Sequence, residues 1–317
     1  MDGNGFLGCP RAYLPPAKAR FLRIGKFVER RAPSKSGIIV NSSEMFKQRD
    51  AIIRLLQDDD PDTVTLTKKQ LATGGTEIIS DLKDLLSTDD EKVAFHVRDI
   101  LSSIEGRSAK TAFEDVCRNI SATADLERGC WYLAKVFLPG LEIQKYMDIV
   151  NDWGQELQSR TARLDSAPAR VLAMAHFLGR DLGLRGNADN YYNVNNSLLP
   201  CVIDSRLGIP ISLSVLYMIV ASRAKIVVDG INLPGHFVVR HGDILFDPFH
   251  EGRVLSSRDC AEILSQQKLS LQPSHLQSAP PRLVLMRILG NLLHIFEEDD
   301  ESLHQTIAKW IHLLEHQ

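Results

Sequence analysis

A histidine and an aspartate flank a predicted β-hairpin in residues 231–252, INLPGHFVVRHGDILFDPFHEG. His236 follows Pro-Gly, and Asp247 precedes Pro-Phe eleven positions further on. If His241–Gly242 form a two-residue turn, His236 and Asp247 are directly opposed, with Cβ atoms about 4.5–5.5 Å apart. A carboxylate at that distance can orient an imidazole, which is the base–orienter half of a catalytic triad. A three-residue turn would instead pair Asp247 with Phe237 and break this opposition.

A catalytic pair of this kind needs a nucleophile. A reactive cysteine is commonly activated at a helix N-terminus, where the dipole and free N–H groups lower the thiol pKa. The helix expected before the sheet begins at Pro210 and offers only Ser212 and Ser214 there. Serine at a helix start is more often a cap, and Cys201 lies nine residues before Pro210. Two interpretations stay open. Either the pair of His236 and Asp247 has no nucleophile, or the protein is a hydrolase or acyltransferase that uses Ser212 or Cys201.

The hairpin also carries several potential metal ligands, which are His236, His241, Asp247 and His250. Three ligands of these types could hold zinc. However, the turn residue His241 is expected at the far end of the hairpin, and no H-E-x-x-H or comparable spacing occurs. We therefore expect no metal ion and no other cofactor.

The elements that must position these residues change in character along the chain. The segment SRLGIPISLSVLYMIVASRA (205–224) has apolar residues around nearly its whole circumference, which predicts a helix buried on most sides. The next segment, KIVVDGINL (225–233), is rich in β-branched residues and is typical of a strand. A mainly helical α+β fold is therefore predicted, with helices packed on a small antiparallel sheet.

Helical segments are expected on both sides of a core in residues 108–270. Residues 43–107 repeat a helix, an acidic turn and a second helix at an offset of 30, and resemble a pair of HEAT-like repeats. Their acidic turns are interpreted as solvated helix caps. Residues 271–317 form two amphipathic helices that resemble a TPR-like unit, with Leu285, Ile288, Leu292, Ile307, Trp310 and Leu313 inward. Residues 1–42 show no periodicity and predict a basic flexible tail.

Composition and charge exclude several classes of function. Charged residues make up 24% and hydrophobic residues 44%, as in ordinary globular proteins. A net charge of -3 gives no electrostatic reason to bind nucleic acid or an anionic membrane. We see no apolar run of the roughly 18–20 residues that span a membrane, and no signal peptide. Five cysteines without a C-x-x-C pair predict neither a disulfide framework nor a cysteine zinc site. We expect a cytoplasmic protein.

The motifs of the core resemble a known family. The motifs are Asn195-Asn196-Ser197, GIPISL (208–213), LPGHF (233–237) and DPF (247–249). Together they resemble the bacterial SirB-type family, whose core is transglutaminase-like, over roughly residues 110–315. The resemblance implies a papain/transglutaminase-like core in which a helix packs against an antiparallel sheet. It places His236 and Asp247 on the family's PGHF and DPF positions, and it implies that the superfamily's cysteine at the helix start is absent.

Two positions depart from the family pattern. The family's YYDP appears here as Tyr191-Tyr192-Asn193-Val194, which removes an acid and a proline and weakens any claim that this loop supplies a carboxylate. A glycine that usually follows the helix is replaced by Lys225, which is expected to alter only the helix end.

The resemblance brings no settled activity with it. Helical repeats commonly build concave protein-binding surfaces, so we expect a non-catalytic module that recognises an unidentified protein or peptide. Its cleft or partner-binding surface is expected to include Tyr191, Tyr192, Asn195, Asn196, Ser197, Pro210, Pro234, Gly235, Phe237 and Phe249. A hydrolase or acyltransferase, and a purely structural pair of His236 and Asp247, remain the alternatives.

Overall fold

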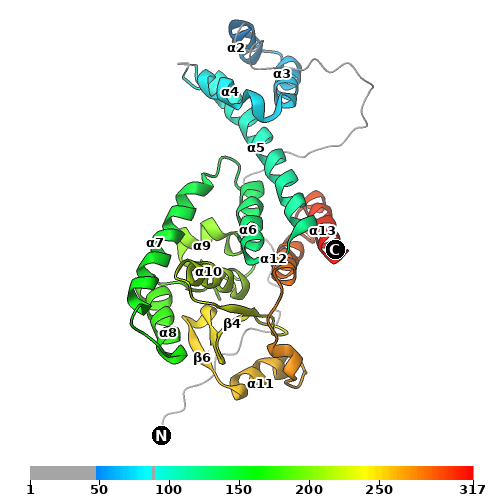
Figure 1. Ribbon diagram of the computed structural model, residues 1–317. Helices are drawn as coiled ribbons and strands as arrows, with labels where there is room; N and C mark the ends of the chain where they lie inside the picture. The colour runs from blue at the N-terminus through cyan, green and yellow to red at the C-terminus, as the bar shows by residue number, and fades with distance from the viewer. Residues whose placement is uncertain (1–47, 88–89, 317) are drawn as a thin grey trace. The chain divides into compact units, whose positions relative to one another are not determined.

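The structure, a computed structural model, describes residues 48–87 and 90–316 of the chain. The expected basic tail, residues 1–42, lies outside the described residues. Helices dominate the described chain, and a four-stranded antiparallel sheet lies among them (Figure 1). The predicted α+β fold, mainly helical with a small antiparallel sheet, is confirmed.

Two pairs of helices begin the described chain. The side chain of Asp60 caps the second helix by accepting two backbone N–H groups of its first turn. Asp90 caps the fourth helix in the same way, by accepting the N–H of Val93. Acidic residues thus stabilise two helix starts. The elements are α2 (Arg49–Gln57), α3 (Pro61–Thr73), the 3₁₀ turn η1 (Gly75–Ile78), α4 (Ile79–Leu85) and α5 (Glu91–Asn119).

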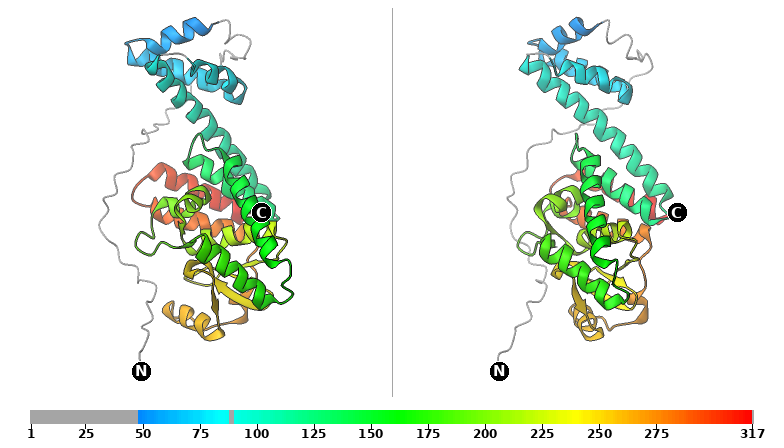
Figure 2. Two further views of the ribbon diagram at one scale, coloured as in Figure 1. Left: turned by 90° about the vertical axis from the view of Figure 1, so that its left-hand side faces the viewer. Right: turned by 60° about the vertical axis from the view of Figure 1, so that its left-hand side comes forward.

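Helix α5 contributes to two hydrophobic clusters, and both views of Figure 2 show it as one continuous helix. Its first half, from Val93 to Ile104, packs with α2, α3 and α4. Its second half adds Phe113, Val116 and Cys117 to the main core. The boundary expected between residues 107 and 108 therefore lies inside this helix.

Helix α10 is the centre of the main core. Every residue from Pro210 to Ala221 is buried, as its apolar circumference predicts. It packs on α7 on one side and on strands of the sheet on another. The elements from α6 to the sheet are α6 (Thr123–Phe137), α7 (Ile143–Thr161), α8 (Ala167–Met174), the π-helix η2 (Ala175–Asp181), β1 (Arg185–Gly186), η3 (Val194–Ser197), α9 (Leu199–Ser205), β2 (Leu207–Gly208) and α10 (Pro210–Arg223).

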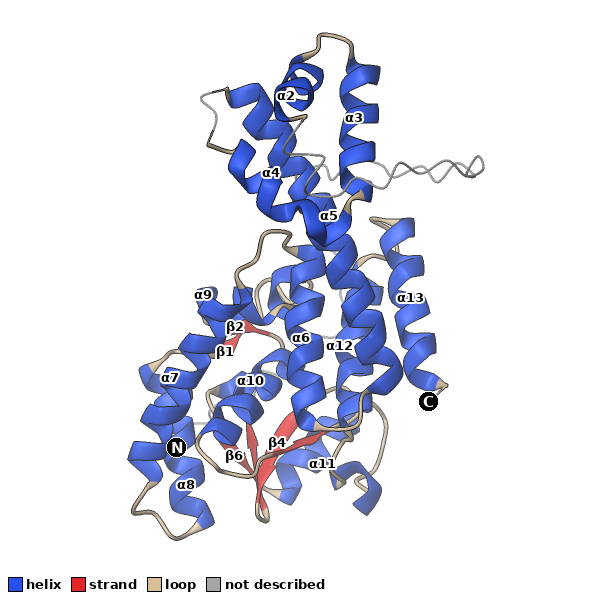
Figure 3. Cartoon of the chain, turned by 45° about the horizontal axis from the view of Figure 1, so that its top comes forward, coloured by secondary structure: helices blue, strands red, loops and turns tan. Residues whose placement is uncertain are grey.

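The four strands follow one another in sequence order, β3-β4-β5-β6, and lie between α10 and α11 (Figure 3). Val239 and Phe246 belong to the cluster around α10. Val238 and Leu255 pack instead with Cys260 of α11, as alternation along a strand requires. The elements are β3 (Asp229–Ile231), β4 (Val238–His241), β5 (Ile244–Asp247), η4 (Pro248–His250), β6 (Arg253–Leu255), α11 (Ser257–Gln266) and η5 (Pro273–Leu276).

The hairpin between β4 and β5 turns one residue later than predicted. His241 pairs with Ile244, so Gly242 and Asp243 form the turn, and both registers expected from the sequence are wrong. The physical reason is the backbone of the first turn residue, which has a positive φ in the tight turns that hairpins favour. Gly242 adopts φ 58° there, whereas the predicted turn would have required His241 to do so.

Two antiparallel helices, α12 (Pro281–Ile295) and α13 (Glu301–Glu315), end the chain and pack on α5 and α6. Trp310 is buried edge-on against Phe113 of α5, with ring centroids 4.8 Å apart. Five of the six residues predicted to face inward are buried, and Leu314 takes the place expected for Leu313. Within residues 48–87 and 90–316, none of the helices has the length and apolar character needed to cross a membrane.

Candidate functional site

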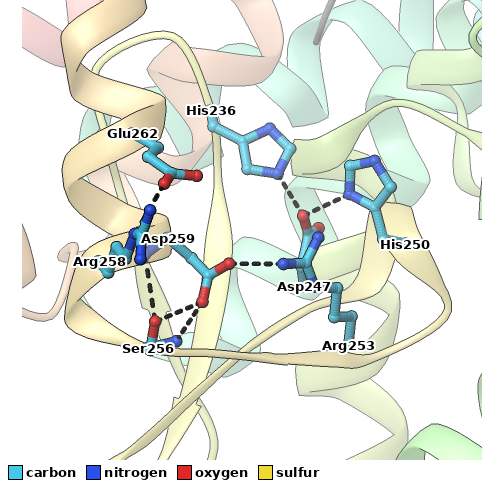
Figure 4. A network of polar contacts seen from close by, with 8 residues as sticks. All are labelled: His236, Asp247, His250, Arg253, Ser256, Arg258, Asp259 and Glu262. Carbon is cyan, nitrogen blue, oxygen red and sulfur yellow. Dashed lines mark hydrogen bonds and ion pairs between the residues drawn. The ribbon is translucent and has the colours of Figure 1, made fainter. Parts of the chain in front are cut away.

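His236 and Asp247 form the hydrogen-bonded pair that the sequence predicts. The Nε2 atom of His236 lies 2.7 Å from Oδ2 of Asp247 (Figure 4). Both side chains are buried, with 5% and 2% of their surfaces exposed. His236 follows Pro234-Gly235, where Gly235 takes φ 82°, and Asp247 is the last residue of β5.

The shifted register still places the two side chains on one face of the hairpin. Extending the observed pairing puts Asp247 opposite Val238, which is two residues beyond His236. Side chains two residues apart in extended chain point the same way, so His236 becomes a diagonal neighbour of Asp247. Diagonal neighbours are within reach of a long side chain, and the imidazole covers the extra distance.

A second histidine, His250, binds the same carboxylate oxygen. Its Nδ1 atom lies 2.7 Å from Asp247 Oδ2, and the backbone N–H of Phe249 donates to Oδ1 at 2.9 Å. The short helix η4 brings both groups back to Asp247, with Pro248 in its first turn. The spacing Asp-Pro-Phe-His carries this signal, although the sequence alone indicates His250 only as a possible metal ligand.

The charge of Asp247 is stabilised by these contacts. Burial raises the pKa of the Asp247 carboxyl, but hydrogen bonds from His236 and His250 outweigh burial and hold the pKa well below its usual range. The bond to Asp247 in turn raises the pKa of His250, against the opposing effect of burial. Because an ionised carboxylate only accepts hydrogen bonds, His236 donates through Nε2–H and His250 through Nδ1–H.

Among the described residues, the side chain of His236 hydrogen-bonds through Nε2 only, which leaves Nδ1 uncommitted. Phe249 packs edge-on against the His236 ring at 6.1 Å between centroids, and the His250 ring lies 6.2 Å away. An oriented imidazole with one uncommitted nitrogen can act as a base towards a nucleophile, or it can hydrogen-bond a ligand.

Ser212 is not placed to use that base. It is fully buried in the first turn of α10. Its hydroxyl donates to the carbonyl oxygen of Asn196 at 2.5 Å and accepts the N–H of Ile209 at 3.1 Å. The hydroxyl thus caps the helix and ties it to the preceding loop. Ser214 points to the carbonyl oxygen of Phe237 at 3.4 Å.

Cys201 lies on a different helix, α9, and is half-buried. Burial raises the pKa of its thiol, and the nearby Asp204 raises it further. Such a thiol is protonated at neutral pH and is a weak nucleophile. In the described chain, no hydrogen bond joins Cys201 Sγ to His236.

The residues expected to bind a partner separate into two groups. Tyr192, Asn195 and Gly235 are exposed, while Tyr191 and Pro234 are half-buried. The other expected residues are all buried, and they are Asn196, Ser197, Pro210, Phe237 and Phe249.

Asn196 holds the loop that carries the exposed Tyr192. Its amide group donates to the carbonyl oxygens of Asn190 and Tyr191, at 2.7 and 3.0 Å. Its own oxygen accepts from the side chain of Asn187 at 3.0 Å. Asn196 is thus a positioning residue for this loop.

Three of the four potential metal ligands come together in the structure. Nitrogen atoms of His236 and His250 and an oxygen atom of Asp247 all lie within 4.8 Å of one another. His241 is not with them, since its Nδ1 donates to the carbonyl oxygen of Val227 at 2.8 Å.

Comparisons with known proteins agree with this architecture. Residues 144–290 match the family model of the transglutaminase-like superfamily. A UPF0162 protein of Xylella fastidiosa is 34% identical over 178 residues, which cover 53% of this chain and 63% of that protein. A UPF0162 protein of Pseudomonas aeruginosa is 29% identical over 185 residues, 56% of this chain and 66% of that protein.

A human protein is similar over a shorter segment. F-box only protein 21 is 30% identical over 135 residues, 39% of this chain and 21% of that protein. No solved structure shows significant similarity. The chain spans less than two thirds of the length of each of these relatives. The comparisons support the transglutaminase-like part of the predicted resemblance, and the SirB-type subfamily stays a prediction. Residues 144–290 are therefore similar to the transglutaminase-like superfamily.

Proposed function

We propose that this chain is a transglutaminase-like protein that recognises a ligand or a protein partner and does not catalyse acyl transfer. The observation that carries the proposal is the start of α10. There a nucleophile is needed, and the chain presents Ser212, which is fully buried. Its hydroxyl is committed to the backbone at both its donor and its acceptor side.

Activation of Ser212 would require its hydroxyl proton to move to His236. That proton is donated to the Asn196 carbonyl, so activation first breaks a buried hydrogen bond. Breaking it leaves a buried carbonyl oxygen without this partner, at about 1–3 kcal/mol.

An exposed tyrosine, Tyr192, fits recognition, and ring contacts connect it to His236 through Tyr191 and Phe249. Tyr192 keeps 48% of its surface exposed and packs edge-on against His294 of α12, with ring centroids 5.2 Å apart. Tyrosine supplies a large contact area with a polar end, which is why interfaces are enriched in it. The ring is oriented from both sides, because Tyr191 also packs edge-on against it at 5.2 Å.

We place this function in the cytoplasm, and we propose a protein or peptide as the partner, with neither nucleic acid nor membrane involved. Cys130, Cys201 and Cys260 are free thiols, which fits a reducing compartment. The helical repeats expected at both ends of the chain support a protein partner, since stacked helix pairs commonly build surfaces for proteins.

The catalytic alternative is tested by covalent labelling. The chain is treated with iodoacetamide and with a fluorophosphonate, and mass spectrometry locates the adducts. We expect only slow labelling of Cys201 and none of Ser212, with the same rates in His236→Ala. Fast labelling of either residue that disappears in His236→Ala, but not in the hairpin control His241→Ala, refutes the proposal and favours a hydrolase or acyltransferase.

Recognition itself is tested with peptides selected on the immobilised chain from a random display library. We expect Tyr192→Ala to weaken the selected peptides at least about tenfold, with an unchanged melting temperature. The control Val227→Ala removes another exposed hydrophobic side chain and should leave affinity unchanged. Equal binding by both variants refutes the assignment of Tyr192. If His236→Ala lowers stability but not affinity, the His236–Asp247 pair is purely structural.

A further inference from the structure

We infer that His236, Asp247 and His250 form a binding site for one divalent transition-metal ion, with Zn²⁺ the best match. The inference goes beyond the proposed function and does not rest on it, because the site needs neither a nucleophile nor a partner. The relevant geometry is the convergence of two imidazole nitrogens on one carboxylate oxygen (Figure 4).

Both histidines approach Asp247 Oδ2 at 2.7 Å. A metal ion would take the place of the two hydrogen-bonded protons and accept Nε2 of His236, Nδ1 of His250 and the carboxylate oxygen as ligands. Zinc–nitrogen and zinc–oxygen bonds are about 2.0–2.2 Å long. The three ligand atoms already lie within 4.8 Å of one another, so only small side-chain movements are required. Each neutral ring keeps its proton, which moves to the ring nitrogen that faces away from the ion.

The site has two fixed ligands and one adaptable ligand. Asp247 is held at Oδ1 by the N–H of Phe249, and its carbonyl oxygen accepts the N–H of Gly252 at 2.8 Å. Groups of this kind orient a metal ligand from behind. His236 is buried, whereas the side chain of His250 is 53% exposed. An ion can therefore enter from the side of His250, whose ring is free to adjust.

The donor set selects the kind of ion. Ca²⁺ and Mg²⁺ prefer sites made of oxygen atoms, whereas imidazole favours zinc and its neighbours in the first transition row. Two nitrogens and one oxygen leave a fourth tetrahedral position, which a ligand or water can take. A zinc ion at this place would present an electrophilic centre beside Phe249.

A second group of potential ligands complicates the measurement and must be removed first. His312, Glu315 and His316 lie at the end of α13, with their ligand atoms also within 4.8 Å of one another. All three are exposed, so this group has no buried ligand. The test therefore uses the full chain with His312→Ala and His316→Ala as the background.

The background protein is freed of metal with a chelator and titrated with ZnCl₂ by calorimetry, and separately with CoCl₂ by visible absorption. We expect one Zn²⁺ per chain and the intense bands of four-coordinate Co²⁺. The exposed ligand is tested by His250→Ala, which should fold normally. Loss of a residue that only supports a metal ligand lowers metal affinity by about 10–100-fold. Because His250 is itself a proposed ligand, His250→Ala should lower Zn²⁺ affinity by more than this and should abolish the Co²⁺ bands.

His241→Ala is the matched control, because it removes another histidine from the same hairpin. It should leave both metals bound as before. The inference is overturned if the background binds less than one Zn²⁺ per chain. It is also overturned if His250→Ala and His241→Ala bind alike, since binding is then adventitious.

Discussion

Replacement of Asp247 by asparagine tests whether the buried carboxylate organises the site. Asparagine has nearly the same shape, and its oxygen can still accept the N–H of Phe249. Its NH₂ group, however, replaces the oxygen that accepts from both His236 and His250. A donor then faces two donors, and the rings must rotate or change tautomer.

The magnitude follows from the contacts that are lost. A hydrogen bond to a charged group contributes about 1.5–3 kcal/mol, and two such bonds converge on Asp247 Oδ2. Removal of a buried charge offsets part of this loss. We therefore expect Asp247→Asn to lower the free energy of unfolding by about 2–4 kcal/mol at pH 7. At about 2–4 °C per kcal/mol, the melting temperature should fall by about 4–16 °C.

Thermal unfolding followed by circular dichroism measures this change, with a chelator present so that bound ions do not contribute. Asp229→Asn is the control on the same sheet. Asp229 forms an ion pair with Arg240 at 3.3 Å and is 42% exposed, so its loss should cost no more than about 1 kcal/mol. If both variants lose equally little stability, the carboxylate does not hold the site together, and the reasoning is refuted.

Three further predictions concern the scaffold. Gly154→Ala should destabilise the protein in urea, because the new Cβ would lie 2.1 Å from a side-chain carbon of α10; Gly106→Ala, with nothing within 4 Å, should stabilise it by about 0.5–1 kcal/mol. Lys225→Gly should raise the melting temperature slightly, because Lys225 holds φ 60°, which is costly for a residue with a Cβ; a lower melting temperature would contradict this. Burial raises the pKa of Glu114, but the hydrogen bond from Lys309 and their opposite charges outweigh it and lower the pKa. Its stabilising effect is therefore present above the unfolded pKa of about 4.3 and is lost as pH falls through the lower folded value, so Glu114→Gln should cost more stability at pH 7 than at pH 3.

Much of the scaffold was predictable because helix patterns are local. The buried helix α10 follows from an apolar circumference, and the helix pairs follow from acidic turns whose residues cap helices. The continuity of α5 was less predictable, because the sequence of one helix does not show which hydrophobic cluster each of its halves joins. That choice depends on contacts with α13, which begins 182 residues after the end of α5 (301 − 119).

The functional site was predictable in part for the same reason. The pairing of His236 with Asp247 depends on only one hairpin. The resemblance to transglutaminase-like proteins adds the expectation that the cysteine at the helix start is absent. The commitment of Ser212 to Asn196 could not be foreseen, because it joins α10 to a loop sixteen residues earlier. The burial of Asn196 and Phe249 was missed in the same way, since polar or aromatic residues beside a site look like ligand contacts in sequence.

The error in the hairpin register shows which part of a strand argument is robust. The expected and observed pairings differ by two in the sum of paired residue numbers, so each side chain keeps the same face of the hairpin. A shift of one would have moved Asp247 to the opposite face from His236. Face sharing thus depends on parity alone, whereas direct opposition depends on the turn residue, which here is Gly242. The hydrogen bond between His236 and Asp247 requires only that the two side chains share a face. The predicted pair is therefore observed although the predicted turn is wrong.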